Sequence, residues 1–277
     1  MDGGIERLAL PVRSLRGSDK DEVAEGGEFS EDGKTPLLAA VASGRMEAVR
    51  ARLEVAGVDV NEVDREGRTP LYTAVVGRHL EVARALVRMP GVDVNRANCA
   101  GQTPLIYAVA SGDTEMIRAV LEAPGVDVNL ANRAGQTPFY RAVLVLRRNL
   151  DVVRMLLALP GVDVNRADNG GRTPLYRAIE CKDVAVVREL LEVPGIDIFS
   201  GDPIAAAIRQ GYREVTALLE EALYVRRTVG ATLLALLHQG VPRQAALVLA
   251  IRGLGDESAR ARADRMHAAW HRRKAIA

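Results

Sequence analysis

Apolar residues along the chain fall into short stretches with helical spacing, and these stretches come in pairs. In the first stretch of each pair, Leu or Phe follows a Thr-Pro step and alanine comes three residues later. The second stretch, as in EVARALV (81–87) and EMIRAVL (115–121), has apolar residues three and four positions apart. That interval marks the single buried stripe of an amphipathic α-helix. The pattern therefore predicts pairs of short helices that recur along the chain.

The recurrence has a nearly fixed period when the copies are aligned on the proline of each Thr-Pro step. The intervals are 34, 34, 34 and 36 residues, and the aligned residues are Pro36, Pro70, Pro104, Pro138 and Pro174. A sixth, degraded copy, GDPIAAAI, places Pro203 only 29 residues further on. One helix pair cannot bury its apolar stripe alone, whereas stacked copies bury it between them. The sequence thus predicts a solenoid.

Each copy also carries signals for where its helices begin and end. The threonines of the Thr-Pro steps (35, 69, 103, 137 and 173) suit the N-cap, and the proline suits the first helical position. The second helix should end at a Pro-Gly step, because proline cannot continue a helix and glycine tolerates a left-handed turn. After that step, an extended segment should reach an asparagine that opens the turn to the next copy: Asn61, Asn95, Asn129 and Asn165.

These motifs resemble the ankyrin repeat, whose hallmark is Thr-Pro-Leu-His-x-Ala, then Gly-x-Leu-Glu-x-Val and a Gly-Ala-Asp-Val-Asn turn. GRHLEVARALV (77–87) and the recurring GVDVN match it closely. The resemblance covers residues 33–223 and implies an all-α solenoid of stacked helix-turn-helix units with β-hairpin loops. The hallmark histidine is replaced in every copy, by Leu38, Tyr72, Ile106, Tyr140 and Tyr176. This replacement puts one hydrogen bond of the family in doubt, but not the fold.

Charge divides the rest of the chain into two further segments. Residues 1–32 hold nine acidic and four basic side chains, and we expect a disordered acidic lead-in. From Val225 onward ten Arg and Lys face three acidic residues. Within 224–277, two apolar stretches (228–240 and 242–255) predict short helices that cap the solenoid, and 256–277 predicts an exposed basic helix. We expect a short helical C-terminal extension.

Whole-chain composition points to an intracellular protein. No apolar stretch approaches the roughly 20 residues that cross a bilayer, and the N-terminus lacks the basic-then-apolar order of a secretory signal. Cys99 and Cys181 lie far apart and outside any ligand-like cluster. We expect a monomer in the cytoplasm, with the nucleus as the alternative.

Candidate catalytic and metal-binding motifs are weak. The Asp-Val-Asn turns supply too few oxygen ligands for calcium, whose loops gather theirs within about 12 residues. His267 and His271 have the spacing of zinc-protease helices but lack the adjacent glutamate and a third ligand. Neither cysteine has a histidine in its own copy to activate it. We therefore expect no enzyme, no cofactor and no small-molecule substrate.

In the family, partners lie across the hairpin tips and the inner helices. Carried onto this chain, the resemblance implies these partner-binding residues: Arg65, Glu66, Arg68, Gln102, Tyr107, Arg133, Gln136, Arg141, Arg172, Arg177 and Glu180. The two-residue insertion of the fourth copy adds Arg147 and Arg148 nearby. Basic residues gather in copies four and five, which favours an acidic protein segment as the partner. The alternative is that these arginines only solvate the surface.

The leading functional prediction is a protein-binding scaffold or adaptor. In a second hypothesis the array is a substrate adaptor of a ubiquitin ligase, because residues 238–255 loosely resemble a ligase-recruiting helix with its leading proline. In a third, the basic tail binds polyanions weakly through its seven net positive charges. Nucleic acid is not the expected partner, since the tail has one aromatic residue, Trp270, and no groove-reading motif.

Overall fold

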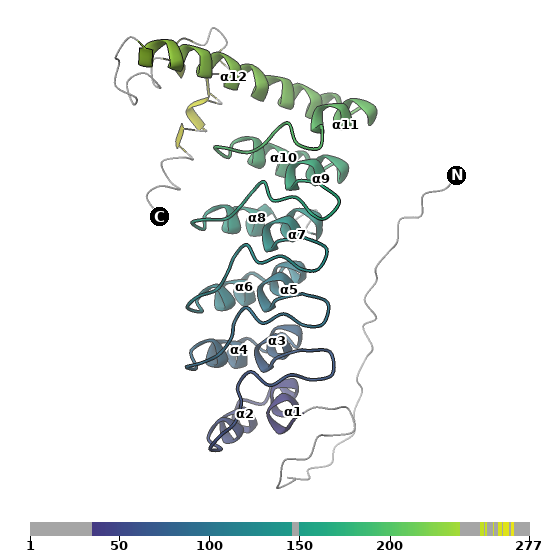
Figure 1. The fold of residues 1–277 in the computed structure, drawn as a ribbon, viewed down its shortest axis with the longest axis vertical. Helices are drawn as coiled ribbons and strands as arrows, with labels where there is room; N and C mark the ends of the chain where they lie inside the picture. Colours follow the sequence, from purple (N-terminus) through teal and green to yellow (C-terminus); the bar gives the residue numbers. More distant parts are fainter. Residues whose placement is uncertain are drawn as a thin grey trace, which may run out of the picture.

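The computed structural model describes residues 35–145 and 150–238, with a few more between 250 and 268. Helix pairs stack into a column in which an inner and an outer row run side by side (Figure 1). The inner row consists of α1 (Pro36–Ser43), α3 (Pro70–Val76), α5 (Pro104–Ser111), α7 (Pro138–Val145), α9 (Pro174–Glu180) and α11 (Pro203–Arg209). The outer row consists of α2 (Met46–Leu53), α4 (Leu80–Val87), α6 (Thr114–Leu121), α8 (Leu150–Leu157), α10 (Val184–Leu191) and α12 (Arg213–His238).

The inner helices begin where the Thr-Pro steps predict. The Thr137 hydroxyl oxygen accepts a hydrogen bond from the backbone N of Tyr140 at 3.1 Å, and the four equivalent threonines do the same. This bond satisfies a backbone donor that has no partner within the helix. In the sixth copy Asp202 takes the role of the threonine and accepts from Ala205 at 3.1 Å. The cap is therefore kept although its residue changes.

One continuous hydrophobic core runs through the stack from Leu37 to Ala222. The alanine that recurs in each inner helix is buried, as at Ala74, Ala108 and Ala142, so neighbouring helices approach closely. A smaller cluster joins α12 to the extension, where Val225 packs with Ile251 and Ala263. These contacts place Ile251 and Ala263 of the extension against α12, and the capping role stays a prediction.

Asparagines join successive copies through a ladder of side-chain bonds. The amide N of Asn129 donates to the carbonyl of Gly161 at 2.7 Å, and its amide O accepts from the backbone N of Asp163 at 2.8 Å. Asn61, Asn95 and Asn165 bond to the next copy in the same way. These residues thus hold adjacent copies in register, a role beyond the turn formation expected of them. Phe199 follows Asn165 by one repeat period, and the ladder ends there.

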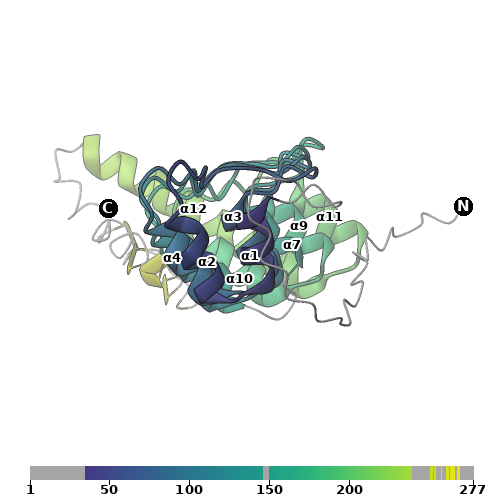
Figure 2. The same ribbon diagram turned by 90° about the horizontal axis from the view of Figure 1, so that it is seen from below.

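The loops between copies project together beside the inner row (Figure 2). Each is a hairpin closed by few backbone bonds, such as Asp64 N to Arg68 O at 3.2 Å and Gly67 N to Asp64 O at 2.9 Å. The described residues contain no strand, because these arms are too short to form a ladder. Neighbouring hairpins bond to each other, as in Cys99 N to Glu66 O at 2.8 Å.

The last outer helix differs from expectation. α12 has 26 residues and runs without a break through Leu223, so the expected boundary between 223 and 224 falls inside a helix. The expected separate helix at 228–240 is instead the second half of α12 as far as His238. A Pro-Gly step follows α4, α6, α8 and α10, and α12 has no such step to stop it.

The expected acidic lead-in at 1–32 lies outside the described residues. Within the described part of the chain, no helix is both long and apolar enough to cross a membrane.

Candidate functional site

A single column of accessible positions runs along the inner row, four residues after each capping threonine. We call this column the inner strip, and its members are Ala39, Thr73, Tyr107, Arg141 and Arg177. Each is at least partly exposed, whereas the next residue of each helix is the buried alanine. The strip therefore presents four kinds of side chain in five copies, with arginine in the last two, on a frame that hardly changes. Its first part is small or polar, its middle aromatic and its last part basic.

Tyr107 rests on a fixed support in the middle of the strip. Its ring centroid lies 5.6 Å from that of buried Tyr72, with the planes tilted by 60°, an arrangement that aromatic pairs favour. The Tyr72 hydroxyl donates to Gln102 at 3.2 Å and accepts from Asn98 at 2.9 Å. Burial raises the pKa of Tyr72 to about 12, so its hydroxyl stays protonated. Tyr72 replaces the hallmark histidine and keeps a hydrogen bond between copies.

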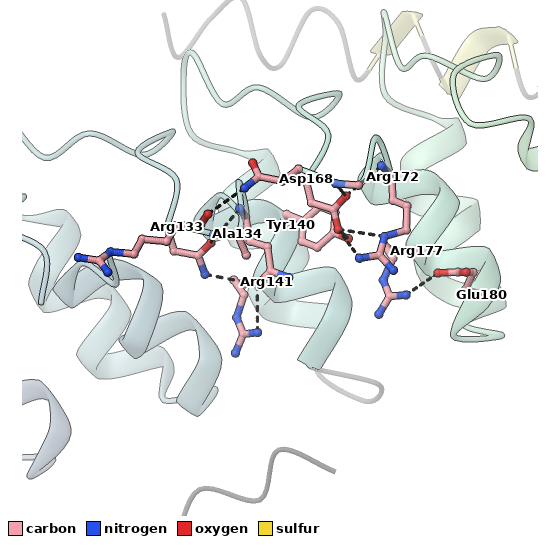
Figure 3. A network of polar contacts seen from close by, with 12 residues as sticks. Arg133, Ala134, Tyr140, Arg141, Asp168, Arg172, Arg177 and Glu180 are labelled. Carbon is pink, nitrogen blue, oxygen red and sulfur yellow. Dashed lines mark hydrogen bonds and ion pairs between the residues drawn. The ribbon is translucent and has the colours of Figure 1, made fainter. Parts of the chain in front are cut away.

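Arg141 carries a charge with little compensation. One guanidinium N donates to the side-chain oxygen of Gln136 at 3.3 Å, and Nε is buried without a hydrogen-bond partner. In the described part of the chain no carboxylate forms an ion pair with it. Burial lowers the pKa of Arg141, because a buried cation loses hydration. Its guanidinium extends to the same side of the stack as that of Arg177 (Figure 3).

Arg177 is the next residue of the strip and is already paired. Its guanidinium forms an ion pair with Glu180 one turn further along α9. The two side chains are 21% and 28% exposed, so the pair is reachable from the inner face. Arg177 and Glu180 together offer a neutral pair of charges in place of a lone cation.

Two other arginines of the expected site lie against buried aspartates at the base of the hairpins. Arg68 contacts Asp64 at 2.6 Å, and Arg172 contacts Asp168 at 2.8 Å (Figure 3). Burial alone would raise the pKa of Asp168, but hydrogen bonds from Tyr140 and Arg172 outweigh it and lower this pKa.

The intervening copies use neutral side chains at the same two positions, with asparagine at the first and glutamine at the second. The pairs are Asn98 with Gln102 and Asn132 with Gln136. Sequence reasoning missed this alternation, although the matched change from Asp/Arg to Asn/Gln four residues apart is visible in the chain. The alternation indicates that Arg68 and Arg172 stabilise their own hairpins by pairing with Asp64 and Asp168.

The hairpin tips hold the remaining expected residues. Arg65, Glu66 and Arg133 are exposed there. The carbonyl of Arg133 accepts from the side chain of Asn169 at 2.8 Å, which joins two tips. The structure thus places the predicted residues in three settings: on the inner strip with Glu180 beside it, at the bases of the hairpins, and at the hairpin tips.

Thiols and candidate metal ligands do not converge on this site. Cys99 is exposed at a hairpin tip and Cys181 is half-buried at the end of α9. Among the residues searched, no three His, Cys, Asp or Glu side chains come together as a metal-binding group. His271, Arg147 and Arg148 lie outside the described residues.

Stacked helix pairs with projecting hairpins and a variable inner face define a repeat solenoid built for recognition. A family model described as ankyrin repeats (3 copies) matches residues 10–98, 89–168 and 125–202. The chain belongs to the ankyrin repeat family. Ankyrin repeats are in general protein–protein interaction modules, and the fold is a non-catalytic one.

Solved ankyrin structures superpose on most of the chain. One is the ankyrin repeat domain of Bcl-3, described as a unique member of the IkappaB protein family, with 28% identity and a TM-score of 0.62 over 69% of this chain and 87% of that one. Another is an ankyrin repeat domain from Acinetobacter baumannii AYE, with 28% identity and a TM-score of 0.58 over 68% of this chain and 97% of that one. No curated protein matches the chain significantly in sequence.

Proposed function

We propose that the chain is a scaffold or adaptor that holds an acidic segment of another protein against the inner strip and the hairpin tips. The observation that carries the proposal is the contrast between constant and variable positions. The buried alanines are the same in five copies, while the accessible strip position is Ala, Thr or Tyr in the first three copies and Arg in the last two. A surface that varies on a fixed frame suits recognition of a particular partner.

Charge supports an acidic partner. Arg141 and Arg177 follow each other on the strip, and exposed Arg133 lies on a neighbouring hairpin tip (Figure 3). Guanidinium groups bind carboxylates through charge-assisted, often bidentate hydrogen bonds. The proposed array domain extends to about residue 238, because α12 continues past the expected boundary at 223. The free thiols of Cys99 and Cys181 fit a reducing, intracellular setting.

The test is affinity capture of partners from the native cell with the intact protein and with an R141A/R172A/R177A variant. We expect the variant to capture less of the partner, and its binding to respond less to salt. The matched control is R88A/R118A/R154A, which removes three charges from the outer row: the C-cap residue of α4 and one residue each of α6 and α8. Equal loss in both variants, or loss in neither, would count against the inner face.

The C-terminal extension supports a second candidate function. The packing of Ile251 and Ala263 on α12 is consistent with a cap, while the ubiquitin-ligase hypothesis needs an accessible docking helix in the same region. Truncation after His238 keeps α12 whole and separates the two. A cap predicts a lower melting temperature, whereas a docking segment predicts loss of ligase co-purification from a still folded array. Retention of random DNA at low salt would instead favour polyanion binding.

A further inference from the structure

Three arginines of the proposed site, Arg141, Arg172 and Arg177, differ in how far the protein already neutralises them. Arg172 contacts buried Asp168 at 2.8 Å, and Arg177 is paired with Glu180. Among the residues that the structure describes, the side chain that hydrogen-bonds to Arg141 is the neutral one of Gln136, at 3.3 Å. A carboxylate from outside would compete with an existing acid at two of these positions and would meet an uncompensated charge at the third.

The setting of Arg141 makes that charge costly in the free protein. Its Nε is buried without a partner, and the guanidinium is partly removed from water. A desolvated cation without a counter-ion destabilises the folded state, and an incoming carboxylate relieves that cost. Hydrogen bonds to charged groups are also stronger where water is excluded.

Tyr107 supplies an apolar surface on the inner helix that precedes Arg141. It occupies the same strip position on the preceding inner helix, and α5 and α7 pack directly against each other. Its ring is held against Tyr72 and offers an apolar face beside the cation. Ala110, one turn further along α5, is also partly exposed and adds apolar surface.

The distance between the two subsites sets the spacing of the bound residues. Packed helices lie about 8–10 Å apart, and an extended chain advances about 3.3 Å per residue. Adjacent positions on the strip therefore correspond to about three residues of an extended peptide.

We infer that Arg141 is the anchoring cation of the inner strip and binds one Asp or Glu of an extended partner segment, with an apolar side chain three residues away on Tyr107. The inference deepens the proposed function and rests on it. It assigns Arg172 and Arg177 to the internal structure of the array and makes Tyr107 the second specificity-determining residue.

The test is selection of random dodecapeptides displayed on phage against the intact protein, followed by titration of the enriched peptides. We expect enriched peptides to share a carboxylate and an apolar residue three positions apart, in either chain direction. R141Q should weaken them by about tenfold or more, because it removes the charge–carboxylate pair. The matched variants R172Q and R177Q should weaken them by less than about threefold, since these charges are already compensated. Y107A should weaken only peptides that carry the apolar residue.

A charge exchange provides the decisive measurement. R141E should reject the acidic peptide and should bind the same peptide with lysine in place of the acid. The thermal midpoint of unliganded R141Q should equal or exceed that of the natural protein, which excludes misfolding as the reason for lost binding.

Three results would overturn the inference: no enriched peptides, a consensus without the acid, or equal sensitivity to R141Q and R177Q. The proposed function survives the last of these, because binding would still depend on the inner face. It fails separately if capture of the cellular partner is indifferent to all three arginines.

Discussion

Tyr140 donates its hydroxyl to a carboxylate oxygen of Asp168 in the following copy, across 2.6 Å and out of contact with water. Burial and this bond raise the pKa of Tyr140, so the hydroxyl stays a donor. The same carboxylate accepts from the side chain of Arg172 and from two backbone N–H groups of its hairpin, at Gly170 and Arg172. One buried acid therefore joins an inner helix, the next hairpin and a cation.

Replacement of Asp168 by Asn should destabilise the array, and a second change should restore it. D168N leaves Arg172 without its carboxylate and should lower the free energy of unfolding by about 1–2 kcal/mol. D168N/R172Q recreates the natural pair of Asn132 and Gln136 and should recover most of that loss. Urea titration measures both as shifts of the midpoint at constant slope. Additive losses in the double variant would show that the two positions are independent.

The contribution of Asp168 should disappear in acid. Its pKa in the folded chain lies below the ordinary value of 3.8, so the unfolded chain takes up a proton first as the pH falls. The stabilisation is complete above the unfolded pKa of about 4 and is lost as the pH falls through the lower folded value. The difference in unfolding free energy between the natural chain and D168N should shrink from pH 6 toward about pH 3. If the difference in unfolding free energy stayed constant over this range, the stabilising role of the ionised Asp168 would be contradicted.

Two glycines with the same backbone angle should respond differently to alanine. Gly125 and Gly135 both have a φ of +76°, where a side chain is strained. A Cβ at Gly125 meets nothing within 4 Å, so G125A should cost only the backbone strain of about 1–2 kcal/mol. A Cβ at Gly135 comes within 2.7 Å of the backbone N of Asn169, so G135A should cost more by separating two hairpins. Chemical denaturation gives the difference, and equal losses would mean that the hairpins are not packed together.

The asparagine ladder should matter most in the middle of the array. N129A removes the bonds to Gly161 and Asp163 and should cost about 1–3 kcal/mol, because each of the two hydrogen bonds between copies contributes about 0.5–1.5 kcal/mol. N61A removes the same bonds near the free end, where a single copy can fray without unfolding the rest. Hydrogen exchange should show loss of protection confined to the first copy in N61A and spread over several copies in N129A. The reverse pattern would contradict a nearest-neighbour solenoid.

Local signals in the sequence predicted much of the fold. A Thr-Pro step starts a helix through residues that are adjacent in the sequence, and the step recurs with a period of 34 residues. The inner helices therefore begin where expected. Bonds between copies were harder to predict, since a side chain such as Asn95 meets a partner 30 residues away. The repeat pattern predicted a helix end near residue 223. α12 instead continues to His238, because no Pro-Gly step interrupts it.

The candidate site was predictable in position but not in electrostatics. The register of the copies identifies Tyr107, Arg141 and Arg177 as one column. Whether an arginine is free or paired depends on side-chain directions that composition does not contain. Asp168 was absent from the expected site, yet it determines how much charge Arg172 can offer to another molecule.

Phe199 ends the ladder of asparagine side chains that joins successive copies. A benzyl group, 71% exposed, stands where each earlier copy has the amide that grips its successor. Duplication of an internal copy would supply matching donors and acceptors at both new junctions, whereas a copy appended after residue 199 would find neither. Added copies would therefore keep the asparagine ladder only where they are inserted before residue 199.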